Sequence, residues 1–244
     1  MKKNINFYKH DIAPDNTWLN KEYLIQLNLT GKCPRNCDFC YMKKYKNSFL
    51  SSSKIKKLWE NLRKYNEAYG IEYRVNLTGG DIFEHPECQK IIKFISEESS
   101  ITAVDPLINK IWTKKQYQIL ELIKDKINFI QLNSDLVTEK DLLEIKKLGK
   151  EIILKIAIYG GDFKSKVKKI KELSEKFDNI IVSIDLIIPQ KGNTIKKSNF
   201  LIFDKERLKK RISKLKKVFG DKLWLLSTPI KREILKEIYF LKPI

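Results

Sequence analysis

The sequence predicts an α/β fold in which strands and helices alternate. Six short runs rich in Ile, Leu, Val and aromatic residues recur along the chain, and the segments between them carry apolar residues at helical spacing. This alternation favours a parallel sheet with right-handed crossovers. The 244 residues are enough for one α/β barrel or two small domains, and 42% hydrophobic residues can supply a substantial core.

The predicted strands are short apolar runs that end at turn-forming residues. The third run is the weakest, because Asp105-Pro106 follows it directly, and we expect this strand to end at Val104. The run from Leu223 to Leu226 is a candidate for a short extra strand. The six main strands are predicted at 22–29, 71–77, 101–104, 128–132, 151–159 and 179–188.

Capping residues and apolar spacing place helices between these strands. Ser51-Ser52-Ser53 offers N-caps for a helix that runs to Tyr69 and ends at Gly70. Pro86 is expected in the first turn of the second helix, which continues past Ile95. The remaining helices are predicted at 114–125, 138–148, 163–177, 204–218 and 230–240.

The chain is strongly basic, with a net charge of +19 and a pI near 9.6. Only six of its 49 basic residues are arginine, the side chain that binds phosphate bidentately, and the lysines are spread over several helices. This distribution does not favour a nucleic-acid partner, and an acidic peptide or acidic electron donor fits the charge equally well. One group is expected to form a solvated helix face: Lys164, Lys166, Lys168, Lys169 and Lys171.

The sequence predicts no membrane segment. No apolar stretch approaches the about twenty residues of a membrane span. No apolar core follows the basic start, Met1-Lys2-Lys3, as it would in a signal peptide. We therefore expect a cytoplasmic protein, where the reducing environment also suits clustered free thiols.

Three of the four cysteines, Cys33, Cys37 and Cys40, follow the first predicted strand with the spacing C-x3-C-x2-C. An odd cluster without a secretory signal does not favour disulfides. Zinc is one alternative, although structural zinc commonly takes four ligands and no second C-x2-C pair exists. An iron–sulfur cubane is the other, because it normally takes four thiolates and three would leave one iron open.

The cysteine motif resembles the signature of radical S-adenosylmethionine (SAM) enzymes, with Phe39 in the aromatic position before the last cysteine. A second match follows the next predicted strand. Thr78-Gly79-Gly80-Asp81 resembles the family's G-G-E motif with Asp in place of Glu. Glycines allow close backbone approach, and carbonyls with a carboxylate can receive an ammonium. The shorter Asp81 could contact SAM or only orient the turn.

The resemblance implies a partial (β/α)6 TIM-like barrel with parallel strands over residues 22–225. Residues 1–21 would be a lead-in, and residues 226–244 a C-terminal helix and tail. It also implies that the three cysteines hold a [4Fe-4S] cluster whose open iron binds SAM. Phe39 and residues 78–81 would then contribute to the cofactor site. An electron from a flavodoxin- or ferredoxin-type donor would cleave SAM to a 5′-deoxyadenosyl radical that takes hydrogen from the substrate.

Further candidates lie at the ends of later strands. Asn133 and Asp135 resemble the family's S-x-D ending that binds the SAM ribose, or they form a helix N-cap and turn. Lys155 stands among apolar residues, where it would bind the SAM carboxylate, pair with an acid or face solvent. Asp185 is a candidate catalytic acid or substrate contact, or a hydrogen-bonded core residue.

Cys88 is the remaining cysteine, and it is either a hydrogen-atom donor to a substrate radical or a buried inert thiol. Auxiliary iron–sulfur clusters need more cysteines than this chain has. Neither His10 nor His85 belongs to a motif with a partner, so a nucleophilic triad has no support.

Three functions are consistent with these features of the sequence. The first is a single-cluster radical SAM enzyme acting on a peptide or protein. The second is a small-molecule enzyme of the same superfamily, in cofactor or modified-nucleoside synthesis. The third is a zinc-containing module that binds nucleic acid without catalysis.

Overall fold

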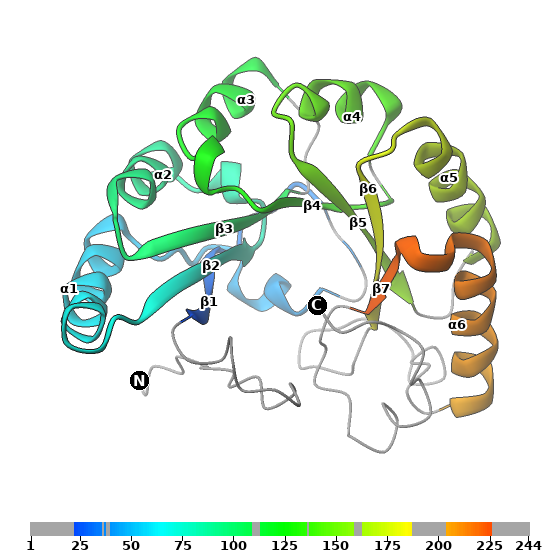
Figure 1. The fold of residues 1–244 in the computed structure, drawn as a ribbon, viewed down its shortest axis with the longest axis horizontal. Helices are drawn as coiled ribbons and strands as arrows, with labels where there is room; N and C mark the ends of the chain where they lie inside the picture. Colours follow the sequence, from blue (N-terminus) through cyan, green and yellow to red (C-terminus); the bar gives the residue numbers. More distant parts are fainter. Residues whose placement is uncertain are drawn as a thin grey trace.

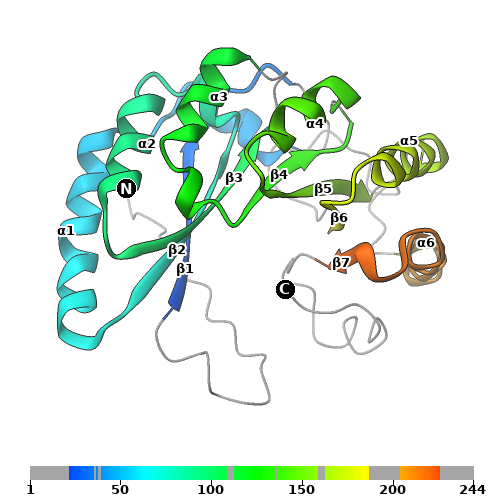
Figure 2. The ribbon, with the colours of Figure 1, turned by 45° about the horizontal axis from the view of Figure 1, so that its top comes forward.

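The computed structural model describes residues 22–35, 37, 40–108, 113–135, 137–158, 163–186 and 204–225. In these residues seven strands form one sheet in sequential order, and all neighbouring strands are parallel. The helices lie along the outer side of the curved sheet (Figures 1 and 2). No pairing joins the first strand to the last in this part of the chain, so the predicted partial barrel of parallel strands is confirmed.

The strands have the following bounds: β1 Glu22–Thr30, β2 Glu72–Gly79, β3 Ile101–Ile108, β4 Phe129–Asn133, β5 Glu151–Ile158, β6 Ile180–Leu186 and β7 Leu223–Leu225. The α-helices are α1 Ser52–Tyr69, α2 Cys88–Glu97, α3 Lys114–Glu121, α4 Glu139–Lys146, α5 Phe163–Lys176 and α6 Lys205–Phe219. Short 3₁₀ helices are η1 Tyr41–Tyr45, η2 Ile82–Glu84, η3 Lys124–Lys126 and η6 Gly220–Lys222.

Local sequence explains most helix ends. The Ser51 side chain accepts a hydrogen bond from the Lys54 N–H and begins α1, and Gly70, with φ of 65°, ends it. The second helix differs from the prediction, because α2 begins at Cys88 and Pro86 lies before it. The reason is a separate turn in which the His85 ring accepts the Glu87 N–H.

The prediction that the third strand ends at Val104 is wrong, because β3 continues to Ile108. Asp105 is tolerated within the sheet because the Arg74 guanidinium of β2 binds its carboxylate at 2.6 Å. Pro106 stands opposite Leu77, at the point where β3 stops pairing with β2 and begins pairing with β4. A proline donates no N–H, so it fits where one ladder gives way to the next.

The two faces of the sheet differ in polarity. Alternate residues of each strand pack against the helices in one apolar core, which includes Leu27, Val75, Ile130, Leu154 and Val182. The residues between them face the barrel interior and are largely polar: Gln26, Asn28, Arg74, Asn76, Asp105, Gln131, Asn133, Lys155, Ser183 and Asp185. Closed TIM barrels fill this space with branched apolar side chains. A polar interior instead suits a binding chamber.

Several predictions fall outside the described residues: the lead-in at 1–21, the polar loop at 190–198 and the helix at 230–240. The domain boundaries therefore stay predictions. In the part of the chain that the structure describes, no helix is both long and apolar enough to span a membrane.

Candidate cluster and SAM site

The three clustered cysteines lie in the loop between β1 and η1. This loop is closed at its base, where the Gly31 N–H donates to the Ser48 carbonyl at 2.9 Å. A Cβ at position 31 would come 1.8 Å from the Tyr45 carbonyl oxygen, so the loop closes this tightly only with glycine there. Within the loop, the Cys40 N–H donates to the Cys37 carbonyl at 3.0 Å.

All three thiols are free and partly exposed. Burial raises the pKa of Cys33 to about 11, and the neighbouring charges of Asp81, Cys37 and Cys40 add to this. Burial also raises the pKa of Cys37, although the Arg35 charge opposes it. Thiolates that repel one another in a partly desolvated loop need a bound cation, so this donor set fits a metal cluster.

No three His, Cys, Asp or Glu side chains converge on one point for a single metal ion within the described ranges. A cubane does not need its thiolates to converge on one point, because each of them binds a different iron. Three thiols spread along one loop therefore fit a cubane.

The turn after β2 is bonded directly to the cluster loop. The Gly80 N–H donates to the Thr30 carbonyl at 2.5 Å, and the Asp81 N–H donates to the Lys32 carbonyl at 2.9 Å. A Cβ on Gly80 would lie 2.1 Å from that Lys32 oxygen. Gly79 has φ of +112°, which side chains rarely adopt. The paired glycines therefore let the two loops approach each other.

Two polar side chains beside these glycines have defined partners. Asp81 is fully buried, and its Oδ1 accepts the Phe83 N–H at 3.0 Å, which caps η2. Of its two alternative roles, orienting the turn is the one visible in the structure, while a SAM contact stays a prediction. The Thr78 hydroxyl donates to Asn28 Oδ1 at 2.8 Å and so joins β2 to β1 on the inner face.

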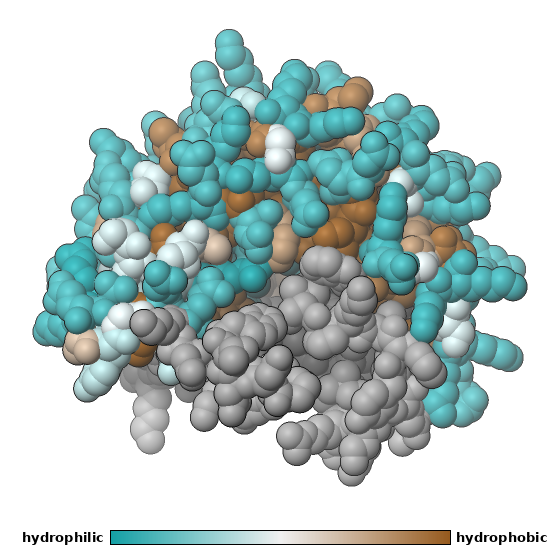
Figure 3. Space-filling model, viewed as in Figure 1, coloured by the Kyte–Doolittle hydropathy of each residue, from teal (hydrophilic) through white to brown (hydrophobic). Residues whose placement is uncertain are grey.

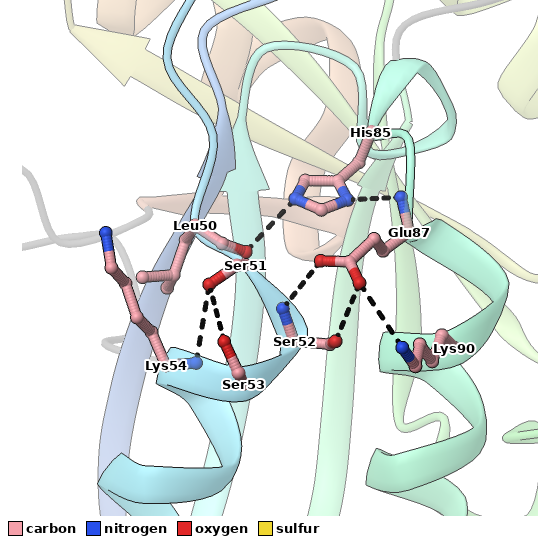
Figure 4. A network of polar contacts seen from close by, with 8 residues as sticks. All are labelled: Leu50, Ser51, Ser52, Ser53, Lys54, His85, Glu87 and Lys90. Atoms are coloured by element: carbon pink, nitrogen blue, oxygen red, sulfur yellow. Dashed lines mark hydrogen bonds and ion pairs between the residues drawn. The ribbon is translucent and has the colours of Figure 1, made fainter.

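A second polar network joins the segments that leave the two loops (Figure 4). His85 Nε2 lies 3.1 Å from the Leu50 carbonyl, and its Nδ1 accepts the Glu87 N–H at 3.0 Å. Because a carbonyl only accepts, His85 carries its proton on Nε2. The Glu87 carboxylate accepts hydrogen bonds from the N–H and hydroxyl of Ser52, both at 2.9 Å. Apart from the run Glu84-His85-Pro86-Glu87, no sequence pattern predicts this network.

The end of β4 meets both the cluster loop and α5. Asn133 Oδ1 accepts the Asp135 N–H at 3.2 Å, while Thr138 caps α4. The interpretation of Asn133 and Asp135 as the helix N-cap is therefore wrong, although the turn is present. The Asp135 carboxylate pairs with Lys166 at 3.0 Å and with Arg35 at 3.7 Å.

This arrangement also corrects the prediction of a solvated lysine face on α5. Lys168 and Lys171 are exposed, and Figure 3 shows that hydrophilic residues predominate on the visible outer surface. Lys166 is half-buried against Asp135, and Lys169 donates to the Ser134 and Asp135 carbonyls at 3.2 Å. Lysines at this spacing lie partly on the inner flank of the helix, where they reach the end of β4.

The model of the radical SAM superfamily matches residues 27–202, which include both motifs and most of the sheet. The chain belongs to the radical SAM superfamily. Members of this superfamily are enzymes that use a [4Fe-4S] cluster and SAM. This overturns the alternative of a non-catalytic zinc module.

Solved structures agree with this fold. SuiB from Streptococcus suis superposes with a TM-score of 0.57 at 15% identity, over 86% of this chain and 50% of SuiB. SuiB bound to S-adenosylmethionine gives 0.56 at 14% identity, over 86% and 51%. Methylornithine synthase (PylB) gives 0.54 at 15% identity, over 94% and 86%. This chain spans only about half the length of SuiB. No curated protein matches its sequence.

Three of the remaining candidates, Lys155, Asp185 and Cys88, lie in the described residues. Lys155 on β5 lies 3.7 Å from Asp185 on β6, so each is the other's charge partner on the inner face. The Asp185 side chain is 38% exposed, which does not fit a core residue. Cys88 lies in the apolar core outside the sheet, where burial raises its pKa to about 12. This placement fits an inert thiol, and its donor role stays a prediction. Phe39 lies outside the described residues.

Proposed function

We propose that this radical SAM enzyme takes a hydrogen atom from a peptide or protein and so modifies it after translation. The observation that supports a large substrate is the open sheet. In the described residues β1 is an edge strand, and its inner-face side chains Gln26 and Asn28 are exposed. Residues 48–50 pair with the end of β1 at Leu29 and Thr30, but no described residue pairs with the outer edge of β1 before Leu29, so exposed amides there can hydrogen-bond an extended peptide backbone.

In this proposal Cys33, Cys37 and Cys40 hold the cluster. When bound, cluster and SAM together supply the radical that takes hydrogen from the substrate. The chain's own contribution is to orient the site. The Thr78–Asp81 turn is bonded to the cluster loop, so backbone and carboxylate groups at 78–81 lie beside the cysteines. Backbone carbonyls there can receive the SAM ammonium, and the Asp81 carboxylate either joins them or holds the turn in place.

Three further residues, on β5 and at the end of β4, complete the proposed SAM site. Asn133 and Asp135 lie at the end of β4 and Lys155 on β5, and the Ser134 N–H donates to the Lys155 carbonyl at 3.1 Å. The Lys155 ammonium is the candidate for the SAM carboxylate, and Asp185 beside it is the candidate for substrate contact. Lys155 and Asp185 present opposite charges, as a zwitterionic group would require.

The charge of the protein favours acidic partners. A net charge of +19 attracts an acidic peptide and an acidic flavodoxin- or ferredoxin-type donor, and it raises association rates at low salt. A cytoplasmic location would keep the three cluster thiols reduced. Nucleic acid is not favoured, because few of the basic residues are arginine.

A small-molecule substrate is the second candidate. The superposition on methylornithine synthase (PylB) covers 94% of this chain and 86% of that one, so the two chains share a similar fold over most of their lengths. Several inner-face polar groups are also paired with each other. Gln131 donates to Asn76 at 3.1 Å, and Arg74 binds Asp105. Such a prearranged polar wall can orient a compact polar ligand.

The test begins with anaerobic reconstitution. About four iron and four sulfide per chain are expected, with 5′-deoxyadenosine formed from SAM and dithionite. Cys37→Ala should abolish SAM cleavage and lower the iron content, whereas Cys88→Ala should keep its iron. Cleavage retained by Cys37→Ala would refute the ligand set.

The substrate class is tested with deuterium. Acidic peptides labelled at Cα and labelled small amino acids are offered separately to the reconstituted enzyme. Deuterium in 5′-deoxyadenosine from the peptides alone supports the peptide proposal. Transfer from the small molecules alone contradicts it and supports the second candidate.

A further inference from the structure

Arg35 lies between two of the cluster cysteines, yet its side chain reaches across to the end of β4. Its Nη2 lies 3.7 Å from Asp135 Oδ2. The Arg35 side chain is only 10% exposed and that of Asp135 is 20% exposed. A guanidinium is rarely buried without a charged or hydrogen-bonding partner, because its desolvation is costly.

Asp135 is a rigid acceptor for this arginine. Its N–H is held by Asn133 Oδ1, and its carbonyl accepts from Lys169 at 3.2 Å. Lys166 binds both oxygens of its carboxylate, Oδ1 at 3.0 Å and Oδ2 at 3.1 Å. Two contacts therefore hold the backbone of Asp135 and one holds its carboxylate, besides the contact with Arg35.

The positive charges around Asp135 outnumber the negative ones. Three cations, from Arg35, Lys166 and Lys169, lie around Asp135, the first two at its carboxylate and Lys169 at its backbone carbonyl. Only one further carboxylate, that of Asp141, acts on Lys169. Burial lowers the pKa of Lys169, and the Arg35 charge adds to that lowering. An excess of positive charge in a partly desolvated place favours an anion beside it.

One donor of Arg35 is still unused. Its Nη1 is buried from solvent and has no hydrogen-bond partner among the described residues. Arg35 stands two residues after Cys33 and two before Cys37, so the unused donor belongs to the loop that carries the proposed cluster ligands. Thiolate and sulfide sulfurs are acceptors that a bound cluster would bring there.

We propose that Arg35, held by Asp135, is a positioning residue for the cluster, donating to its sulfur atoms and stabilising its reduced form. Reduction adds one electron to the cluster, and a fixed cation nearby makes that added charge more favourable. The inference rests on the proposed cluster at Cys33, Cys37 and Cys40. It gives Asp135 a role through Arg35 that does not depend on a contact with the SAM ribose.

The test is an anaerobic redox titration followed by EPR, in the absence of SAM. Arg35→Gln should keep its iron, and its ratio of reduced to oxidised cluster at a fixed potential should fall about tenfold, or about 59 mV in the midpoint. Arg35→Lys, which keeps the charge, should recover most of this shift. Arg63→Gln is the matched control, because Arg63 is a half-exposed arginine paired with Glu98 on the outer side, and its midpoint should not change.

Asp135→Asn provides a second measurement. The inference expects an altered EPR spectrum of the SAM-free cluster, because Arg35 loses its anchor. An unchanged SAM-free spectrum with weaker SAM binding would overturn the inference and support the ribose contact. If Arg35→Gln does not retain iron, the EPR spectrum and SAM affinity of Asp135→Asn decide between the inference and the ribose contact.

Failure of the inference and failure of the proposed function differ. If the unsubstituted protein binds no cluster, the proposed function fails. If it binds the cluster and cleaves SAM while Arg35→Gln has the same midpoint, only the inference fails.

Discussion

The Glu87 carboxylate accepts two hydrogen bonds from Ser52, one from its backbone N–H and one from its hydroxyl, both at 2.9 Å. Glu87 follows the turn after β2, and Ser52 is the first residue of α1 after the cluster loop (Figure 4). A carboxylate at a helix N-terminus satisfies free N–H groups and interacts favourably with the helix dipole. The contact therefore joins the two loops of the proposed site at their exits.

Glu87→Gln should lower the stability of the protein, because the amide keeps only one acceptor oxygen and no charge for Ser52. A lower urea midpoint with an unchanged denaturant slope is the expected result. Glu97→Gln is the control, because Glu97 pairs with Lys93 on an exposed helix face where ion pairs contribute little. An equal loss in both variants would contradict the role of Glu87.

His85 should make stability depend on pH. Burial lowers its pKa below the ordinary 6.5, and its Nδ1 must stay unprotonated to accept the Glu87 N–H. The folded state therefore binds this proton less readily than the unfolded state. The stabilisation is complete above pH 6.5 and is lost as pH falls through the folded-state pKa. Urea titrations of the unsubstituted protein and His85→Gln from pH 7.5 to 5 should converge at low pH, and parallel curves would contradict the prediction.

Gly80→Ala should separate the two loops. Its Cβ would lie 2.1 Å from the Lys32 carbonyl oxygen, so the turn must move, at about 1–3 kcal/mol of stability. We expect lower iron retention after reconstitution. Gly149→Ala is the matched control, because its φ of +67° brings strain of about 1–2 kcal/mol while nothing lies within 4 Å of its Cβ. Iron loss of equal size in both variants would show that general destabilisation is the cause.

Asp81 can be tested by comparing two substitutions. Asp81→Ala removes the acceptor for the Phe83 N–H. Loss of a cap of this kind lowers stability by about 1 kcal/mol. The substitution should weaken SAM binding more than it lowers iron content. Asp81→Asn keeps an oxygen in the same place. SAM affinity close to that of the unsubstituted protein is expected for Asn, measured by equilibrium dialysis on the reconstituted protein. Equal weakening by Asn and Ala would show that the charge itself contacts SAM.

Local patterns predicted most of the fold. The caps at Ser51 and Gly70 lie where the sequence placed them, because each depends on neighbouring residues alone. The end of the third strand was mispredicted, because Asp105-Pro106 is a strong local breaker. What keeps it in the sheet is Arg74, a residue of another strand. The same cause misplaced Lys166 and Lys169, whose partners lie at the end of β4.

The sequence by itself determined the family, through two short motifs in the right order, and the alternation that requires a parallel sheet. Only the tertiary structure decided which of these residues meet. In the folded chain Gly80 hydrogen-bonds the cluster loop, the Leu50 carbonyl accepts from His85, and Arg35 lies against Asp135. The physical reason is that motifs and caps are local, whereas these contacts depend on strand order and on how each crossover returns the chain to one end of the sheet.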